Sequence, residues 1–138
     1  MTLRPESRAR ARALQLLYAW ETGGQAAPDA VQARLDRLME GRPEVRNLAA
    51  ELFEGVVAER DRLDAIFAPA ALNWRLERIA VLDRNILRLG VYELVHHRVP
   101  PKVAIDEALW LAHRFGGLQS PAFVNGVLDQ VARSLGVL

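Results

Sequence analysis

The sequence contains no cysteine, a single lysine and only three histidines. The absence of cysteine excludes disulfide scaffolds, thiolate zinc sites, iron–sulfur clusters and a cysteine nucleophile. No apolar run approaches the roughly 18 residues that a membrane-spanning helix needs, and no apolar stretch follows a basic start as in a signal peptide. We therefore expect a cytoplasmic protein that does not associate with a membrane.

Arrangements that would support catalysis or metal binding are also missing. His96 and His97 are adjacent, so a helix would point them in different directions, and a polar helix end explains the pair better than chelation. Asp106 and Glu107 are adjacent as well and make a poor acid–base pair. Neither a glycine-rich phosphate loop nor a nucleophile elbow occurs. We predict no catalytic residue, no metal and no cofactor, and thus no enzyme.

The residues that are present predict a helical globular protein. The chain has 138 residues, of which 51% are hydrophobic and 25% charged, enough for one domain or two small subdomains that share a core. Apolar residues recur at spacings of three and four, and the period of two that marks strands is absent. We predict an all-α fold of about seven helices in two packed subdomains, about residues 1–68 and 72–138.

Prolines and glycines mark the boundaries of these helices. The segment at 61–67 either extends the preceding helix or restarts it, and the long stretch at 72–97 forms one bent helix or two. Ser120 is expected to cap the last helix, followed by a proline in its first turn. The predicted helices cover residues 6–22, 28–41, 43–57, 61–67, 72–97, 101–115 and 120–135.

The net charge of +1 conceals an uneven distribution along the chain. Residues 1–20 carry four bases and one acid, residues 21–64 carry six bases and ten acids, and residues 65–138 carry eight bases and six acids. The local charges are therefore +3, −4 and +2. Any contact with nucleic acid must be local, because the chain as a whole is not a polycation.

Arginines dominate the first predicted helix. Arg4, Arg8 and Arg12 are spaced by four and would form one stripe, whereas Arg10 would project nearly opposite Arg8. Cations at a helix start oppose the helix dipole, and a local rule broken in this way points to function. Guanidinium groups at a helix end suit phosphate binding, although a solvated helix start explains the charge pattern equally well.

Asn125 and Gly126 interrupt the last predicted helix. Glycine inside a helix costs about 1 kcal/mol relative to alanine, and asparagine competes for backbone hydrogen bonds. Close packing against another helix is the favoured explanation for the glycine, and close approach of a ligand backbone is the other.

Four segments together resemble a known family. Residues 8–20 read RARARALQLLYAW, residues 82–89 read LDRNILRL, residues 100–108 read PPKVAIDEA, and residues 123–129 read FVNGVLD. This set is similar to the NusB family of bacterial transcription antitermination factors, and the resemblance covers nearly the whole chain.

The resemblance implies a non-enzymatic, all-helical protein with two packed subdomains. Members pair with the ribosomal protein NusE, bind the boxA element of nascent RNA, and act in the transcription elongation complex of ribosomal RNA operons. Together with the charge pattern, it assigns RNA binding to Arg4, Arg8, Arg10, Arg12, Gln119, Ser120 and Phe123. It assigns the surface that faces NusE to Tyr18, Glu77, Asp83 and Arg88.

Some positions depart from the family pattern. Glu6, Ser7 and Ala122 stand where basic residues are common, so fewer phosphate contacts are expected. Phe123 either stacks on a base or fills a core position, as its spacing with Val127 suggests. Because arginines attract phosphate without reading sequence, base recognition must come from unstacked bases bound elsewhere.

Two other functions remain open at this point. The chain could be a protein-interaction bundle with weak or lost RNA binding, forming a homodimer through the same surface. It could instead be a stand-alone relative of the helical RNA-binding domain fused to some ribosomal RNA cytosine methyltransferases. The second alternative is disfavoured because 138 residues leave no room for a methyltransferase domain.

Overall fold

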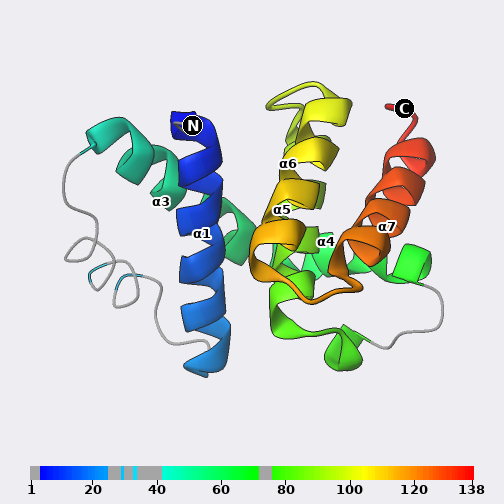
Figure 1. Cartoon of the computed structure of the whole chain (residues 1–138), viewed down its shortest axis with the longest axis horizontal. Coiled ribbons are helices and arrows are strands. Elements are labelled where there is room, and N and C mark those ends of the chain that lie inside the picture. Colours follow the sequence, from blue (N-terminus) through cyan, green and yellow to red (C-terminus); the bar gives the residue numbers. More distant parts are fainter. Residues whose placement is uncertain (1–3, 25–28, 30–32, 34–41, 72–75) are drawn as a thin grey trace. The chain divides into compact units, whose positions relative to one another are not determined.

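A computed structural model describes residues 4–24, 29, 33, 42–71 and 76–138. These residues form six α-helices and two 3-10 turns, and no strand occurs among them (Figure 1). The prediction of an all-α fold is therefore confirmed. No helix in these ranges combines the length and the apolarity required to cross a membrane. The helix predicted over 28–41 falls largely outside the described residues.

The first of two compact units spans Met1–Ala58 and contains two described helices, α1 (Pro5–Thr22) and α3 (Pro43–Ala58). Each begins with a proline, which suits a first turn because its missing N–H has no helical partner there. The helix α1 ends where the Gly23 N–H bonds to the Ala19 carbonyl at 2.9 Å. The two helices lie side by side (Figure 1). Their contact buries Ala9, Val45 and Ala49.

The second unit spans Glu59–Leu138 and is built around one helix whose central ten residues are buried. Its elements are α4 (Arg60–Phe67), η1 (Ala68–Ala71), η2 (Leu76–Arg78), α5 (Val81–His96), α6 (Pro101–Phe115) and α7 (Ser120–Ser134). Every residue of α5 from 85 to 94 is buried, and α5 contacts α4, α6 and α7. A helical segment that is buried on all sides lies in the middle of a bundle, so residues 85–94 form the centre of this unit.

The boundary between the units lies at Ala58 and Glu59, earlier than the expected break near 68–72. The backbone of Glu59, with φ −108° and ψ 14°, leaves the helical region there. The Leu63 N–H then bonds to the Glu59 carbonyl at 2.9 Å and opens α4. The segment at 61–67 is therefore a restarted helix rather than an extension of α3.

The long stretch predicted at 72–97 is shorter as a helix than expected. Residues 72–75 lie outside the described residues, η2 follows, and the extended backbone of Ala80 precedes α5. The Arg84 Nη1 group donates to the carbonyl oxygens of Leu76 and Ile79, each at 2.9 Å. A side chain thus satisfies carbonyls that a continuous helix would have bonded internally. His97, with φ 51°, ends the helix in the left-handed region.

Candidate nucleic-acid interface

The start of α1 displays three exposed arginines, Arg4, Arg8 and Arg12, which we call the arginine stripe. Arg12 Nη1 donates to Gln15 Oε1 at 3.0 Å. Neither Arg8 nor Arg12 forms an ion pair with a carboxylate of the described chain. Like charges four residues apart destabilise a helix by about 0.2–0.5 kcal/mol per pair, and cations at this end also oppose the dipole. The stripe therefore lowers helix stability and presents positive charge to solvent.

Arg10 does not belong to this stripe. It is 5% exposed and lies on the side of α1 that also buries Ala9 and Ala13. Two residues along a helix place a side chain on nearly the opposite face, so Arg10 cannot join the outward-facing arginines. Arg10 also has an interaction partner within the structure. The expectation that Arg10 contacts RNA directly does not agree with this placement.

The loop between α6 and α7 is fixed by Ser120. The Gly117 N–H donates to Ser120 Oγ at 2.9 Å, and the Ser120 N–H bonds to the Gly117 carbonyl at 3.1 Å. Ser120 is 4% exposed, whereas Gln119 and Leu118 are exposed. Contrary to the prediction, Ser120 is the first residue of α7 and not its cap, because its hydroxyl bonds backward into the loop. It is better placed to hold the loop than to contact RNA.

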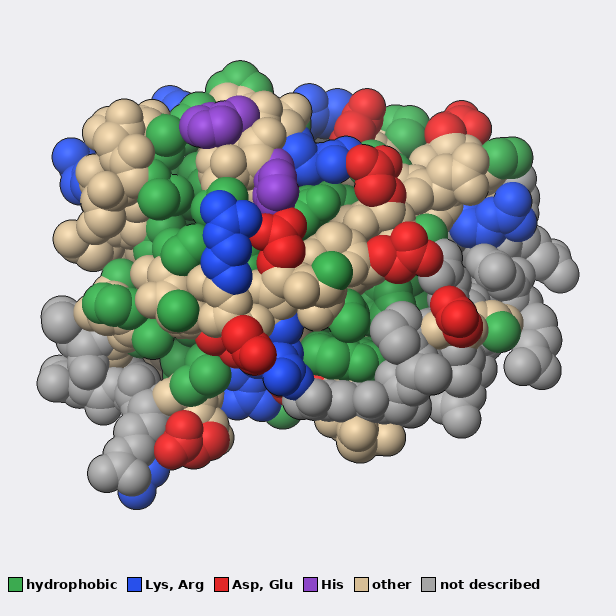
Figure 2. All heavy atoms as spheres, turned by 180° about the vertical axis from the view of Figure 1, so that it is seen from behind, with side chains coloured by type: hydrophobic (Ala, Val, Ile, Leu, Met, Phe, Trp, Pro, Cys, Tyr) green, Lys and Arg blue, Asp and Glu red, His purple; other side chains and the backbone are tan. Residues whose placement is uncertain are grey.

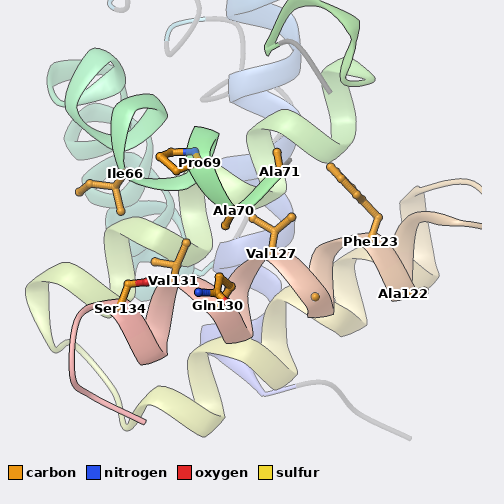
Figure 3. A pocket seen from close by; sticks show the side chains of 11 residues that line it. Ile66, Pro69, Ala70, Ala71, Ala122, Phe123, Val127, Gln130, Val131 and Ser134 are labelled. Carbon is orange, nitrogen blue, oxygen red and sulfur yellow. The ribbon is translucent and has the colours of Figure 1, made fainter. Parts of the chain in front are cut away.

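Gln119 and Phe123 form the outward edge at the start of α7. The Phe123 N–H bonds to the Gln119 carbonyl at 3.1 Å, so the two residues are one helical turn apart and on the same side. Phe123 is half-buried and lines a pocket of about 610 Å³ between α7 and η1 (Figure 3). Both residues can therefore take part in one contact surface.

Gly126 lies in the same pocket, and its surroundings decide between the two explanations of this glycine. A Cβ built on Gly126 would meet nothing within 4 Å. The contrast is Gly90 in α5, where a Cβ would lie 2.8 Å from a Leu128 methyl carbon. Close helix packing accounts for Gly90 but not for Gly126. The favoured explanation from the sequence is therefore wrong for Gly126.

Outside the arginine stripe, basic side chains lie close to acidic ones. Figure 2 shows one face on which basic and acidic side chains of the described residues lie among each other. Arg133 of α7 donates to Asp129 at 2.9 Å, and this hydrogen bond, with the attraction of the same carboxylate, raises the pKa of Arg133. Arg133, the one arginine in the sequence of α7, is thus already paired with an acidic residue.

Three of the four residues assigned to the partner surface, Tyr18, Glu77 and Asp83, are at least partly exposed to solvent. Tyr18 is 45% exposed on α1, and Glu77 is exposed in η2. Asp83 is half-buried in the first turn of α5. Its Oδ1 atom is buried and accepts no hydrogen bond from the described residues. A buried carboxylate oxygen without a donor is costly, so the Oδ1 atom of Asp83 is an unusual feature of the described residues.

Arg88 has a structural role instead. Its side chain is 3% exposed. Its Nε and Nη2 groups donate to the two carboxylate oxygens of Asp64 at 2.7 and 2.9 Å, and its Nη1 group donates to Asn85 Oδ1 at 3.0 Å. This bidentate ion pair joins α5 to α4 inside the second unit. Sequence reasoning missed Asp64, because nothing in a separation of 24 residues signals the pairing.

Metal binding has no support in the described part of the chain, where no group of three or more potential ligands comes together. His96 Nε2 lies 2.5 Å from Glu59 Oε2, and the His96 ring lies 4.5 Å from the Tyr92 ring. The pair forms the polar end of α5, as predicted, and His96 links that end to the start of α4.

The chain is similar to known proteins over nearly its whole length. The sequence model of the NusB family matches residues 7–133. The transcription antitermination protein NusB of Sorangium cellulosum is 48% identical over 131 residues, covering 94% of this chain and 93% of the relative. The NusB protein of Anaeromyxobacter dehalogenans strain 2CP-1 is 44% identical over 129 residues, covering 94% and 91%.

Solved structures share the fold. A structure of T. maritima NusB superposes with a TM-score of 0.82 at 28% identity, covering 96% of this chain and 93% of that one. A chain in a complex of antitermination factors NusB and NusE with double-stranded RNA superposes with a TM-score of 0.82 at 24% identity, covering 96% and 99%. The helical fold, the Arg-rich α1 and the match across residues 7–133 agree, and the chain belongs to the NusB family.

Proposed function

We propose that this non-enzymatic transcription antitermination factor acts by holding boxA RNA and the ribosomal protein NusE together. The observation that carries the proposal is the arginine stripe, because Arg8 and Arg12 expose guanidinium groups without a carboxylate partner in the described chain. Such groups attract RNA phosphates. A related NusB has been solved with NusE and RNA, which supports the same pair of partners here.

The RNA contact would extend beyond phosphate attraction. We place Gln119 and Phe123 in it, because they share one side of the start of α7, and we assign Ser120 to holding that loop in position. We place Arg10 behind the stripe as support for α1. Because only a few basic residues take part, RNA binding alone should be weak, and a second contact through NusE would raise the apparent affinity.

The NusE contact would use Tyr18, Glu77 and Asp83. The exposure of Tyr18 and Glu77 and the half-buried position of Asp83 support this assignment, since a partner can reach part of each of these side chains. Arg88 would act through Asp64, by fixing α5 and therefore Asp83 at its start. We also infer that the protein works in the cytoplasm within the transcription elongation complex.

The test is a titration of fluorescent boxA-like RNA with and without NusE at several salt concentrations. Replacing Arg4, Arg8 and Arg12 with Ala should weaken binding and lower the magnitude of the salt slope by about 2, given about 0.7 counterions per phosphate contact on a single strand. The matched control replaces three other exposed arginines and changes the net charge equally: Arg46, Arg78 and Arg114.

The control should leave both quantities nearly unchanged. Equal effects of the two triple variants would refute a local contact and leave only non-specific attraction. A wild-type protein that binds NusE but no RNA would support the protein-interaction bundle. Light scattering over a range of concentrations would then decide whether that bundle is a homodimer.

A further inference from the structure

The turn η2 (Leu76–Arg78) is a short element into which the helix α5 does not extend. The Ile79 N–H bonds to the Leu76 carbonyl at 3.2 Å, and the hydrogen bonds of such 3-10 turns have poorer geometry than those of α-helices. The Ala80 backbone then becomes extended, with φ −53° and ψ 141°, which separates the hydrogen bonds of η2 from those of α5. The backbone of α5 therefore does not by itself fix the position of η2.

The Arg84 side chain makes the connection that the backbone lacks. Its Nη1 group donates to the carbonyl oxygens of Leu76 and Ile79, each at 2.9 Å. One acceptor opens η2 and the other directly follows it, so a single guanidinium nitrogen bridges both ends of the turn. Hydrogen bonds from a charged donor are stronger than those between neutral groups. The side chain is also half-buried, which limits competition from water.

Two acidic residues placed in the NusE contact stand on either side of this connection. Glu77 is exposed in the middle of η2, and Asp83 directly precedes Arg84 in the first turn of α5. Consecutive residues of a helix point about 100° apart, so Arg84 reaches back to the turn while Asp83 points in another direction. The Arg84 side chain therefore sets where Glu77 lies with respect to Asp83.

We propose that Arg84 is a positioning residue for the NusE contact. Its guanidinium holds η2 against α5, so that Glu77 and Asp83 meet the partner in one fixed arrangement. A contact surface that is ordered before binding loses less conformational freedom on binding. Arg84 acts through Glu77 rather than by touching the partner, since its Nη1 group is engaged with the turn. This inference rests on the proposed function and adds a residue that the proposed function does not use.

The main test is a double-mutant cycle on NusE binding, measured by isothermal titration calorimetry. Arg84→Met keeps an unbranched apolar side chain but donates no hydrogen bond, and should weaken NusE binding about 3- to 30-fold, a loss within the usual range for coupled neighbours. In a protein that already carries Glu77→Ala, the same change should cost less than about twofold, because no Glu77 carboxylate is left to misplace.

Two further variants separate positioning from charge and from folding. Arg84→Lys retains a charged donor on a long stem and should recover part of the NusE affinity that Arg84→Met loses. Arg78→Met removes the same charge from an exposed position in η2 and should change NusE affinity less than twofold. Both Arg84 variants should bind boxA-like RNA like the wild type, since a general loss of folded protein would weaken both kinds of binding together.

Four results would overturn the proposal. The first is that the losses from Arg84→Met and Glu77→Ala simply add, because Arg84 would then not act through Glu77. The second is an equal loss of NusE affinity in Arg78→Met, which would indicate net charge. The third is wild-type NusE affinity in both Arg84 variants while Glu77→Ala weakens binding, which would leave the proposed function intact. The fourth is wild-type affinity in Glu77→Ala, Asp83→Lys and Arg84→Met alike, with which the proposed NusE surface fails as well.

Discussion

The buried, bidentate ion pair between Arg88 and Asp64 leads to a specific prediction about the stability of the protein. Arg88→Met removes both hydrogen bonds to Asp64 and the one to Asn85. Because the Arg88 side chain is only 3% exposed, the Asp64 carboxylate would remain buried without a counter-charge. Breaking such a pair costs about 3–5 kcal/mol, against a total stability of about 5–15 kcal/mol for a typical domain.

The cost of leaving the Asp64 carboxylate unpaired can be separated from the cost of lost side-chain packing. In the double variant Arg88→Met with Asp64→Leu, no buried charge is left unpaired, so most of the lost stability should return. Urea unfolding followed by circular dichroism gives the free energies, provided the slope with denaturant is unchanged. Arg133→Met, which breaks an exposed pair with Asp129, serves as the control and should hardly move the midpoint.

The result also decides the role of Arg88 in partner binding. If Arg88 only positions α5, the double variant should bind NusE like the wild type. A loss below about 1 kcal/mol in Arg88→Met would refute the argument from burial. Restored stability together with lost NusE binding would show that Arg88 contacts the partner directly.

Three further outcomes are expected. Asp83→Lys should reduce co-elution with NusE, because it places a cation where an acidic contact is proposed. The control Asp106→Lys, at an exposed site on α6, should not reduce it. Equal co-elution of both variants with NusE would show that Asp83 is not part of the interface. Gly116→Ala should lower the melting temperature, because its Cβ would lie 2.6 Å from Ser120; an unchanged melting temperature would show that the loop adjusts freely. Ser120→Ala should cost about 1 kcal/mol by removing the acceptor of the Gly117 N–H, and its RNA affinity should fall less than that of Gln119→Ala.

The helices could largely be predicted from the sequence because their signals are local. The apolar periodicity with first-turn prolines located α1, α3, α6 and α7 closely. The start of α5 was placed too early, because no proline or glycine marks the turn before it. That turn depends on the Arg84 side chain, which reaches two carbonyl groups of the preceding segment.

The candidate site was predictable in kind but not in detail. The spacing of Arg4, Arg8 and Arg12 identified a basic stripe, because helical periodicity alone sets which side chains share a face. The same spacing did not reveal that Arg10 is buried or that Ser120 bonds back into its loop. Both depend on what packs against the helix, which residue spacing does not encode.

The sequence by itself determined that this protein is all-helical, lacks thiol chemistry, carries a basic first helix and resembles the NusB family. Each of these follows from composition, local periodicity or motif strings. Only the tertiary structure decided that Arg88 pairs with Asp64 and that Gly126 faces an open groove. Burial and pairing arise from contacts between residues far apart in the chain, so the local sequence around each residue does not predict them.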